Sequence, residues 1–141
     1  MSSLIIVGNG GQGVRFMGNL LAKILILKGY EVSAMYDYDA AMRGGDITAF
    51  IVFSKTSIEN PLIDKADLLL VLAKTKLNFN SAEAVDFSEK EFPDKKLVNM
   101  YSLGFLLSKF KLDVTESELL EVLPSRNKED NLKAIREGMK L

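Results

Sequence analysis

The residues with the clearest chemical potential lie near the N-terminus, in the stretch Gly8-Asn9-Gly10-Gly11-Gln12-Gly13-Val14. Gly8, Gly10 and Gly13 have the Gly-x-Gly-x-x-Gly spacing, and apolar residues 4–7 precede them. Because the apolar positions take a helical period after Gly13, the sequence predicts a glycine turn between a strand and a helix. N–H groups at the start of a helix lack intrahelical acceptors and carry partial positive charge. The turn is therefore a candidate site for an anion such as a pyrophosphate.

A second candidate is Arg43-Gly44-Gly45, in a polar segment between two predicted strands. An arginine beside two glycines can present its guanidinium to a phosphate or carboxylate, although a solvated surface turn has the same composition. Loops at the carboxyl ends of strands in an open α/β sheet converge on one crevice, which can bring Arg43 near the glycine turn. Arg15, in the first turn of the predicted helix, is either solvated or well placed for an anion bound there.

The same turn leaves a nicotinamide-dinucleotide site open as an alternative. Such a site needs an acidic residue at the end of the second strand, about 20 residues on, to bind a ribose hydroxyl. Asp37 follows Gly13 by 24 positions, at the end of the second predicted strand. An aspartate at a strand end is also typical of a turn, which is the simpler interpretation of Asp37.

Composition narrows the chemistry that this chain can perform. Its 141 residues, 48% apolar and 26% charged, fit one soluble globular domain. The net charge of −1 gives no general attraction for nucleic acid, and no apolar run suggests a membrane span. The absence of cysteine and histidine excludes disulfides, thiolate nucleophiles, a histidine base and iron–sulfur clusters held by this chain. With no basic region before the first apolar run, we expect a cytoplasmic protein.

The candidate sites depend on alternating strands and helices. Apolar spacing predicts a helix over residues 14–28, stopped by Gly29, in which Gly18 and Ala22 allow close packing on a sheet. Strands are predicted at residues 4–7, 31–36, 47–53 and 68–72. The last is apolar at every position and is therefore expected to be central. The connection 37–46 is short for a parallel crossover, so the second and third strands are expected to pair antiparallel.

The remaining sequence has weaker signals followed by a helical tail. Asn60-Pro61 is typical of an N-cap and a first helical residue, so a short helical turn is expected to about Lys65. The polar segment 74–96 is expected to contain a short helix and an edge strand around 84–87. Helices are then predicted to begin near Asn99, at the capping box Thr115-Glu116-Ser117-Glu118 before Pro124, and near Asn127.

These elements together predict an α/β fold, a single three-layer Rossmann-like domain over residues 1–141. Its sheet is expected to be open and mostly parallel, with a mixed sheet as the alternative. The C-terminal tail is expected to be helical, and the sequence contains no internal repeat.

Five groups of residues occur in an order that is typical of one family. They are Gly10-Gly11-Gln12-Gly13, Tyr38 with Arg43-Gly44-Gly45, Asn60-Pro61 before Ala66-Asp67, Asn99-Met100 with Leu103-Gly104, and Asn131 with Gly138. In these groups the chain resembles the gamma subunit, or gamma-like domain, of the 2-oxoacid:ferredoxin oxidoreductases, which act on pyruvate, 2-oxoisovalerate, 2-oxoglutarate or indolepyruvate. It departs from the family in the loop before Arg43, where Tyr-Gly-x-Glu-x-Arg-Gly-Gly is common, and in a shorter segment before Asn99.

The resemblance implies a complex that oxidatively decarboxylates a 2-oxoacid with coenzyme A and passes the electrons to ferredoxin. It also implies alpha-like, beta-like and ferredoxin-like partner subunits, which alone hold thiamine diphosphate and iron–sulfur clusters. This chain would assist assembly and the placement of coenzyme A, without catalytic or metal-binding residues of its own, and would be inactive when isolated. The residues implied for the coenzyme are Gly8, Gly10, Gly11, Gln12, Gly13, Arg43, Gly44 and Gly45.

Two other functions remain as alternatives to the coenzyme role. In the first, the chain is a structural subunit without a ligand, and its glycines serve only the turn. In the second, it is a stand-alone NAD(P)-binding Rossmann protein, an interpretation weakened by the lack of an evident proton donor or substrate domain.

Overall fold

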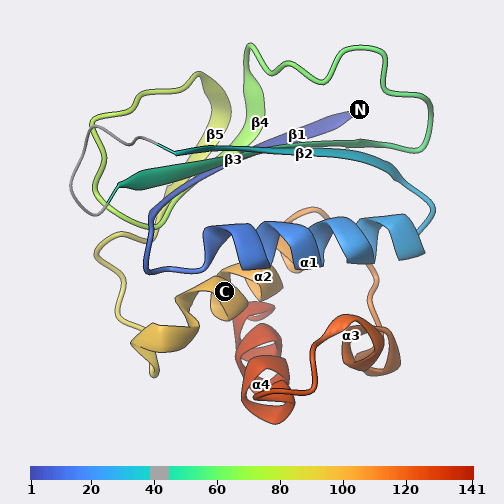
Figure 1. Ribbon diagram of the computed structural model, residues 1–141, viewed down its shortest axis with the longest axis vertical. Helices are drawn as coiled ribbons and strands as arrows, with labels where there is room; N and C mark the ends of the chain where they lie inside the picture. Colours follow the sequence, from blue (N-terminus) through green and yellow to red (C-terminus); the bar gives the residue numbers. More distant parts are fainter. Residues whose placement is uncertain (39–44) are drawn as a thin grey trace. The chain divides into compact units, whose positions relative to one another are not determined.

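The computed structural model describes residues 1–38 and 45–141, which form two compact units, Met1–Lys90 and Glu91–Leu141. The first unit contains a β-sheet and a long helix, and the second is helical (Figure 1). In the part of the chain that is described, no helix has both the length and the apolar character needed to cross a bilayer. That the two units form one domain stays a prediction.

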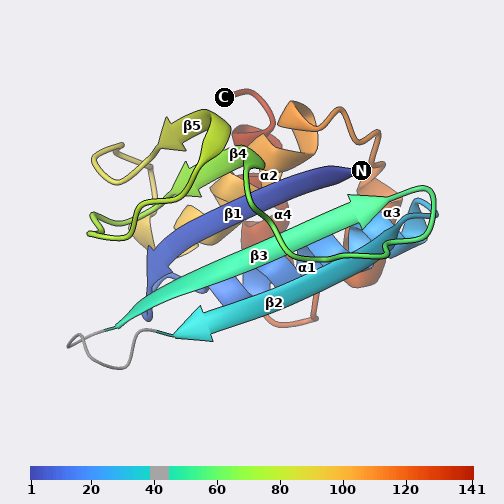
Figure 2. The same ribbon diagram turned by 90° about the horizontal axis from the view of Figure 1, so that it is seen from above.

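A five-stranded sheet forms most of the first unit (Figure 2). Its strands, in spatial order, are β2 (Glu31–Tyr38), β3 (Asp46–Ser54), β1 (Ser2–Asn9), β4 (Ala66–Val71) and β5 (Ser81–Asp86). β3 pairs antiparallel with both β2 and β1, whereas β1, β4 and β5 are parallel. Because β3 alone runs against the other four strands, the sheet is the mixed form of the predicted mostly parallel sheet. The expected antiparallel pairing of the second and third strands is confirmed.

The middle of this sheet is its most buried part. β1 is the central strand, and β4 is an interior strand between β1 and β5. Leu4 to Val7 in β1 expose at most 2% of their surface. Residues 4–7 of β1 and 68–71 of β4 are continuous apolar runs because each face of the sheet is covered at this position.

Helix α1 (Val14–Leu27) lies along one face of the sheet, where it packs against β1, β2 and β3. Its buried side includes Met17, Leu21 and Ile24, which follow the helical spacing of the sequence. Gly18 lies so close to β2 that a Cβ there would overlap the Tyr36 hydroxyl, which confirms its predicted packing role. After the helix, Gly29 has a φ of +86°, the left-handed conformation expected of a residue that stops a helix.

Loop segments cover the opposite face of the sheet. Ile5, Val7, Ala66 and Leu69 form a buried cluster there, against which Phe50, Ile63, Val71 and Phe79 pack. Ile63 comes from the β3–β4 connection and Phe79 from the β4–β5 connection. The Thr75 hydroxyl donates to the Asp46 carboxylate over 2.8 Å, which ties the second connection to the start of β3.

The prediction of a helical turn from Asn60-Pro61 to Lys65 is wrong, because this segment is irregular. The Asn60 side chain accepts the Leu62 N–H over 3.1 Å and so closes a local turn instead of capping a helix. In the segment 74–96, β5 is the predicted edge strand and already begins at Ser81. The helix described there is the short 3-10 helix η1 (Lys95–Leu97), at the end of the range.

The second unit contains three α-helices at the predicted places, α2 (Val98–Lys109), α3 (Glu116–Val122) and α4 (Lys128–Gly138). The capping box is confirmed, since Thr115 and Glu118 each accept the backbone N–H of the other through their side chains. α2 and α4 pack at very short range, because a Cβ at Gly104 or Gly138 would overlap backbone atoms of the other helix.

Candidate functional site

The glycine turn follows β1, at the position in the sheet where the chain leaving β1 and the chain leaving β4 run in opposite directions. From β1 the chain passes through α1 to β2, on one side of β1, whereas from β4 it passes to β5 on the other side. Because β1 and β4 are parallel neighbours, their carboxyl ends adjoin at this position. In open α/β sheets such a divergence leaves a crevice in which ligands bind. The sheet topology thus makes the turn the leading candidate site of the described residues.

The shape of the turn is fixed by its own two amide side chains. Asn9 accepts the Gly11 N–H at its side-chain oxygen over 3.1 Å and the Gln12 N–H at its carbonyl over 3.1 Å. The Gln12 side-chain oxygen in return accepts the Asn9 N–H over 2.9 Å. Three N–H groups of the turn are therefore used inside the turn, which leaves the start of α1 as the part that can receive an anion.

Gln12 also connects the turn to the neighbouring strand. Its Nε2 donates to the Leu72 carbonyl over 2.8 Å, just beyond the end of β4. Gly8 leaves room for this side chain, since a Cβ there would lie 2.8 Å from Gln12 Oε1 and 2.6 Å from Val14 Cγ2. Both ends of the amide are thus used, which explains why a side chain with both a donor group and an acceptor group stands at this position.

The helix begins directly after Gly13, which has a φ of +67°. The N–H groups of the following residues, Val14, Arg15 and Phe16, open α1 and have no acceptor within the helix. Gly11, next to this opening, is exposed, and a Cβ there would meet only Asn9 Oδ1 at 3.7 Å. A ligand can therefore approach the helix start over Gly11 without obstruction by the turn.

Arg15, the second residue of α1, supplies a cation in the first turn of the helix, and its side chain extends toward β2. Its guanidinium donates to the Tyr38 hydroxyl over 3.4 Å and lies 5.2 Å from the centre of the Tyr36 ring. The Tyr38 hydrogen bond raises the pKa of Arg15, and burial raises the pKa of Tyr36. The arginine is therefore charged and both tyrosines from β2 position it, with Tyr36 anchored to Asn19 over 2.8 Å.

Of the two predicted parts of the site, the structure describes the glycine turn fully and the Arg43-Gly44-Gly45 segment only at Gly45. Arg43 and Gly44 lie outside the described residues. Gly45 adjoins the turn, because its carbonyl accepts the Gly10 N–H over 3.1 Å, and Tyr38 contacts Arg15 of α1.

Asp37 lies away from the glycine turn. It falls between Tyr36 and Tyr38, whose hydroxyls reach α1, so by strand alternation its side chain is on the opposite face of the sheet. In addition, β3 separates β2 from β1. This arrangement does not match the acidic residue of a dinucleotide site, which belongs to the strand beside the first.

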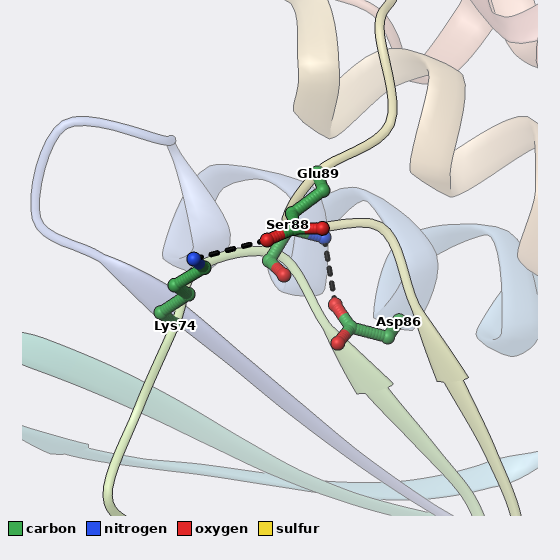
Figure 3. A network of polar contacts seen from close by, with 4 residues as sticks. All are labelled: Lys74, Asp86, Ser88 and Glu89. Carbon is green, nitrogen blue, oxygen red and sulfur yellow. Dashed lines mark hydrogen bonds and ion pairs between the residues drawn. The ribbon is translucent and has the colours of Figure 1, made fainter.

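The ends of β4 and β5 carry a polar network that the sequence did not reveal (Figure 3). Lys74 and Glu89 form an ion pair of 2.9 Å, with both side chains more than three-quarters exposed. Asp86 accepts the Ser88 N–H over 2.8 Å, and this residue's hydrogen bonds lower the pKa of Asp86. The ion pair links the segments that follow β4 and β5. No group of metal-ligating side chains occurs among the residues described.

Two features of the site escaped the sequence. Arg15 and Tyr38 are 23 positions apart, and no local pattern predicts their contact. The double role of Gln12 depends on a carbonyl 60 positions away. The position of Gln12 between glycines could have indicated this double role. Glycines offer no side chain with which its long polar side chain could form hydrogen bonds.

Sequence comparisons identify related proteins. The profile of the pyruvate ferredoxin/flavodoxin oxidoreductase family matches residues 3–86, more than half of the chain. The 2-oxoglutarate synthase subunit KorC of Archaeoglobus fulgidus is 28% identical over 159 aligned positions, which cover 96% of this chain and 85% of KorC. The ketoisovalerate oxidoreductase subunit VorA of Methanothermobacter thermautotrophicus is 32% identical over 81 positions, which cover 57% of this chain and only 17% of VorA.

Solved structures show the same fold at 18% sequence identity. The pyruvate oxidoreductase subunit PORC of Thermotoga maritima matches with a TM-score of 0.74, over 99% of this chain and 95% of PORC. The gamma subunit of a keto/oxoacid ferredoxin oxidoreductase from Geobacter sulfurreducens matches with a TM-score of 0.68, over 99% and 97%. A 2-oxoglutarate:ferredoxin oxidoreductase from Magnetococcus marinus, solved with 2-oxoglutarate, coenzyme A and succinyl-CoA bound, matches with a TM-score of 0.74 over 99% of this chain and 30% of that protein.

Proposed function

This chain belongs to the pyruvate ferredoxin/flavodoxin oxidoreductase family, as a gamma-type subunit of a 2-oxoacid:ferredoxin oxidoreductase, and we propose that it helps to place coenzyme A in the assembled enzyme. In this proposal, alpha-like, beta-like and ferredoxin-like subunits carry thiamine diphosphate and the iron–sulfur clusters. The absence of cysteine and histidine from this chain agrees with that division of labour.

The observation that carries the proposal is that Arg15 lies in the first turn of α1, which begins where the connections from β1 and β4 run to opposite sides of β1. The helix start offers N–H groups and partial positive charge, and Arg15 adds a full charge held by two tyrosines. Coenzyme A is an anion whose diphosphate and ribose phosphate lie at its nucleotide end, so that end matches this chemistry. The enzyme from Magnetococcus marinus, which shares the fold, was solved with coenzyme A bound.

In this role the chain binds and orients the coenzyme and performs no bond-making step. The start of α1 and Arg15 would hold phosphate groups, while exposed Gly11 lets them approach the backbone. Holding the phosphates leaves the distant thiol free to reach the acyl group that partner subunits produce. The chain's effect would therefore be on the affinity for coenzyme A, and not on the affinity for the 2-oxoacid.

The test uses a charge placed at Gly11 in the assembled enzyme, purified through a tag on this chain. Gly11→Asp brings a carboxylate to the helix start, and Gly11→Asn is the matched neutral control of the same shape. We expect the dissociation constant for coenzyme A, measured by calorimetry, to rise about fivefold or more in Gly11→Asp relative to Gly11→Asn. The KM for the 2-oxoacid should not change, and equal coenzyme affinity in the two variants would overturn the proposal.

A structural subunit without its own ligand is the second candidate. It is favoured by the closure of the turn, in which Asn9 and Gln12 already use three N–H groups. Hydrogen exchange in the assembled enzyme separates the two functions. Slower exchange at residues 13–16 on addition of coenzyme A supports the coenzyme role, whereas unchanged exchange there supports the structural one.

A further inference from the structure

Asn9 precedes Gly10 in the turn, and this pair has a chemistry that the function proposed above does not use. The sequence contains eight asparagines, and only Asn9 is followed by glycine. In such a pair the backbone nitrogen of the glycine can attack the side-chain carbonyl carbon of the asparagine, because no Cβ on the glycine obstructs the approach. The reaction is intramolecular, so the two groups are already close together. Both residues are exposed, and water can therefore reach them.

One contact of the turn activates the Asn9 side chain for this attack. The Gly11 N–H donates to the Asn9 side-chain oxygen over 3.1 Å. The ring that this hydrogen bond closes contains both Asn9 Cγ and the Gly10 nitrogen, the two atoms between which the new bond would form. The same N–H would stabilise the negative charge that develops on the side-chain oxygen during the attack, as the donors of an oxyanion hole do.

A second contact opposes the reaction at the other reacting atom. The Gly10 N–H donates to the carbonyl of Gly45, the residue before β3, over 3.1 Å. The Gly10 nitrogen must lose its proton before it can attack, and donation to a neutral carbonyl stabilises the protonated nitrogen. The attack therefore requires that this hydrogen bond opens. The Gly45 carbonyl thus protects a pair that the Gly11 N–H activates.

We propose that Asn9 is a latent deamidation site, which the hydrogen bond between Gly10 and Gly45 protects in the folded chain. When this hydrogen bond opens, the Gly10 nitrogen bonds to Asn9 Cγ and gives up its proton, and the side-chain amide nitrogen leaves with that proton as ammonia. Water then opens the cyclic imide at one of its two carbonyl carbons. The product is aspartate when the new Cγ–N bond breaks, and isoaspartate when the original peptide bond breaks. Water is the only co-reactant, and nothing is oxidised or reduced.

Either product changes the charge of the turn. A neutral amide becomes a carboxylate shortly before the start of α1, where the partial positive charge of the helix favours a bound anion. Isoaspartate also lengthens the backbone of the turn by one carbon, and it takes the carbonyl that accepts the Gln12 N–H out of the main chain. The modified turn would therefore bind coenzyme A more weakly. This consequence rests on the function proposed above, whereas the deamidation itself does not.

The test follows deamidation at Asn9 in the full chain by peptide mass spectrometry, during incubation in mildly alkaline buffer. Gly45→Val should displace the protecting carbonyl, because Gly45 has a φ of +34°, which a β-branched residue rarely adopts. Gly29→Val is the matched control, since Gly29 also has a positive φ, of +86°, but follows the opposite end of α1. We expect Asn9 to deamidate about 2- to 10-fold faster in Gly45→Val than in Gly29→Val, the range that one hydrogen bond accounts for.

The wild-type chain unfolded in urea gives the rate without either contact, and the folded wild type should deamidate at Asn9 more slowly than this reference. Equal rates in the folded and unfolded chain, or equal rates in Gly45→Val and Gly29→Val, would overturn the proposal. The first comparison needs no variant, so it decides the matter even where Gly45→Val does not fold. Asn9→Asp, which carries one of the products, should raise the dissociation constant for coenzyme A in the assembled enzyme about two- to fivefold. Unchanged affinity would overturn the link to coenzyme A, and the mass measurement decides the deamidation separately.

Discussion

Glycines occur both in the turn between β1 and α1 and at the crossing of α2 and α4, but their surroundings differ. At the crossing, a Cβ at Gly104 would overlap the Ile135 carbonyl, and one at Gly138 would overlap the Tyr101 carbonyl. In the turn, a Cβ at Gly8 would meet the ends of two side chains, and one at Gly11 would meet only Asn9 Oδ1, at 3.7 Å. The crossing is therefore limited by backbone, and the turn by side chains.

The difference shows that a glycine in a functional-looking motif can be less important for packing than a glycine outside any motif. A backbone carbonyl in a helix cannot move without disturbing its hydrogen bonds, whereas a side chain can take another rotamer. Gly8 and Gly11 of the motif thus have the more tolerant surroundings, whereas Gly13 has a left-handed φ of +67° that disfavours other residues. The glycines of the helical unit, which follow no nucleotide-binding pattern, have the stricter steric requirement.

The largest effect is expected from Gly104→Ala. Alanine favours a helix by about 1 kcal/mol over glycine, but the new Cβ must push α4 away from α2. We expect a net loss of about 2–3 kcal/mol in the free energy of unfolding, measured by urea denaturation. Ser108→Ala, at an exposed position of the same helix, is the control and should change stability little. A stable Gly104→Ala variant would remove the contrast between the two regions.

The sequence predicted those elements whose signals are local. The period of α1, the capping box of Thr115 and Glu118 and the run of β4 all depend on neighbours a few residues away, and each was found. Asn60-Pro61 failed because its segment is set by distant contacts, with Ile63 packing on the sheet cluster. The preference of Asn60-Pro61 for the start of a helix is weaker than the gain from packing Ile63 on the sheet.

The candidate site was predictable to a similar extent. The turn at Gly8 to Gly13 was located by its spacing, since strand, glycines and helix are consecutive. Its internal closure by Asn9 and Gln12, and the position of Arg15 beside Tyr38, depend on how strands pair. Because β3 enters the sheet between β1 and β2, Asp37 lies two strands from the turn, which spacing alone could not indicate.

A smaller effect is expected within the turn, where Gly8→Ala and Gly11→Ala form a matched pair. The Cβ at position 8 would lie 2.6 Å from Val14 Cγ2 and 2.8 Å from Gln12 Oε1, so both side chains must shift. We expect Gly8→Ala to lose about 1–2 kcal/mol of unfolding free energy, and Gly11→Ala to remain within about 0.5 kcal/mol of wild type. Equal losses in the two variants, measured by thermal unfolding, would show that backbone conformation and not side-chain packing limits the turn.

The smallest effect should come from Gln12→Glu, which tests whether side chains hold the turn. Glutamate keeps the oxygen that accepts the Asn9 N–H, but it replaces the donor to the Leu72 carbonyl with a second oxygen. At pH 7 the carboxylate should therefore cost about 1 kcal/mol of unfolding free energy. The protonated acid can donate to Leu72, so the deficit relative to wild type should shrink as the pH falls below the pKa of the glutamate. Urea unfolding at pH 7 and pH 4 measures both values. No deficit at either pH would mean that the contact with β4 contributes nothing, and that the side chain of Gln12 does not hold the turn.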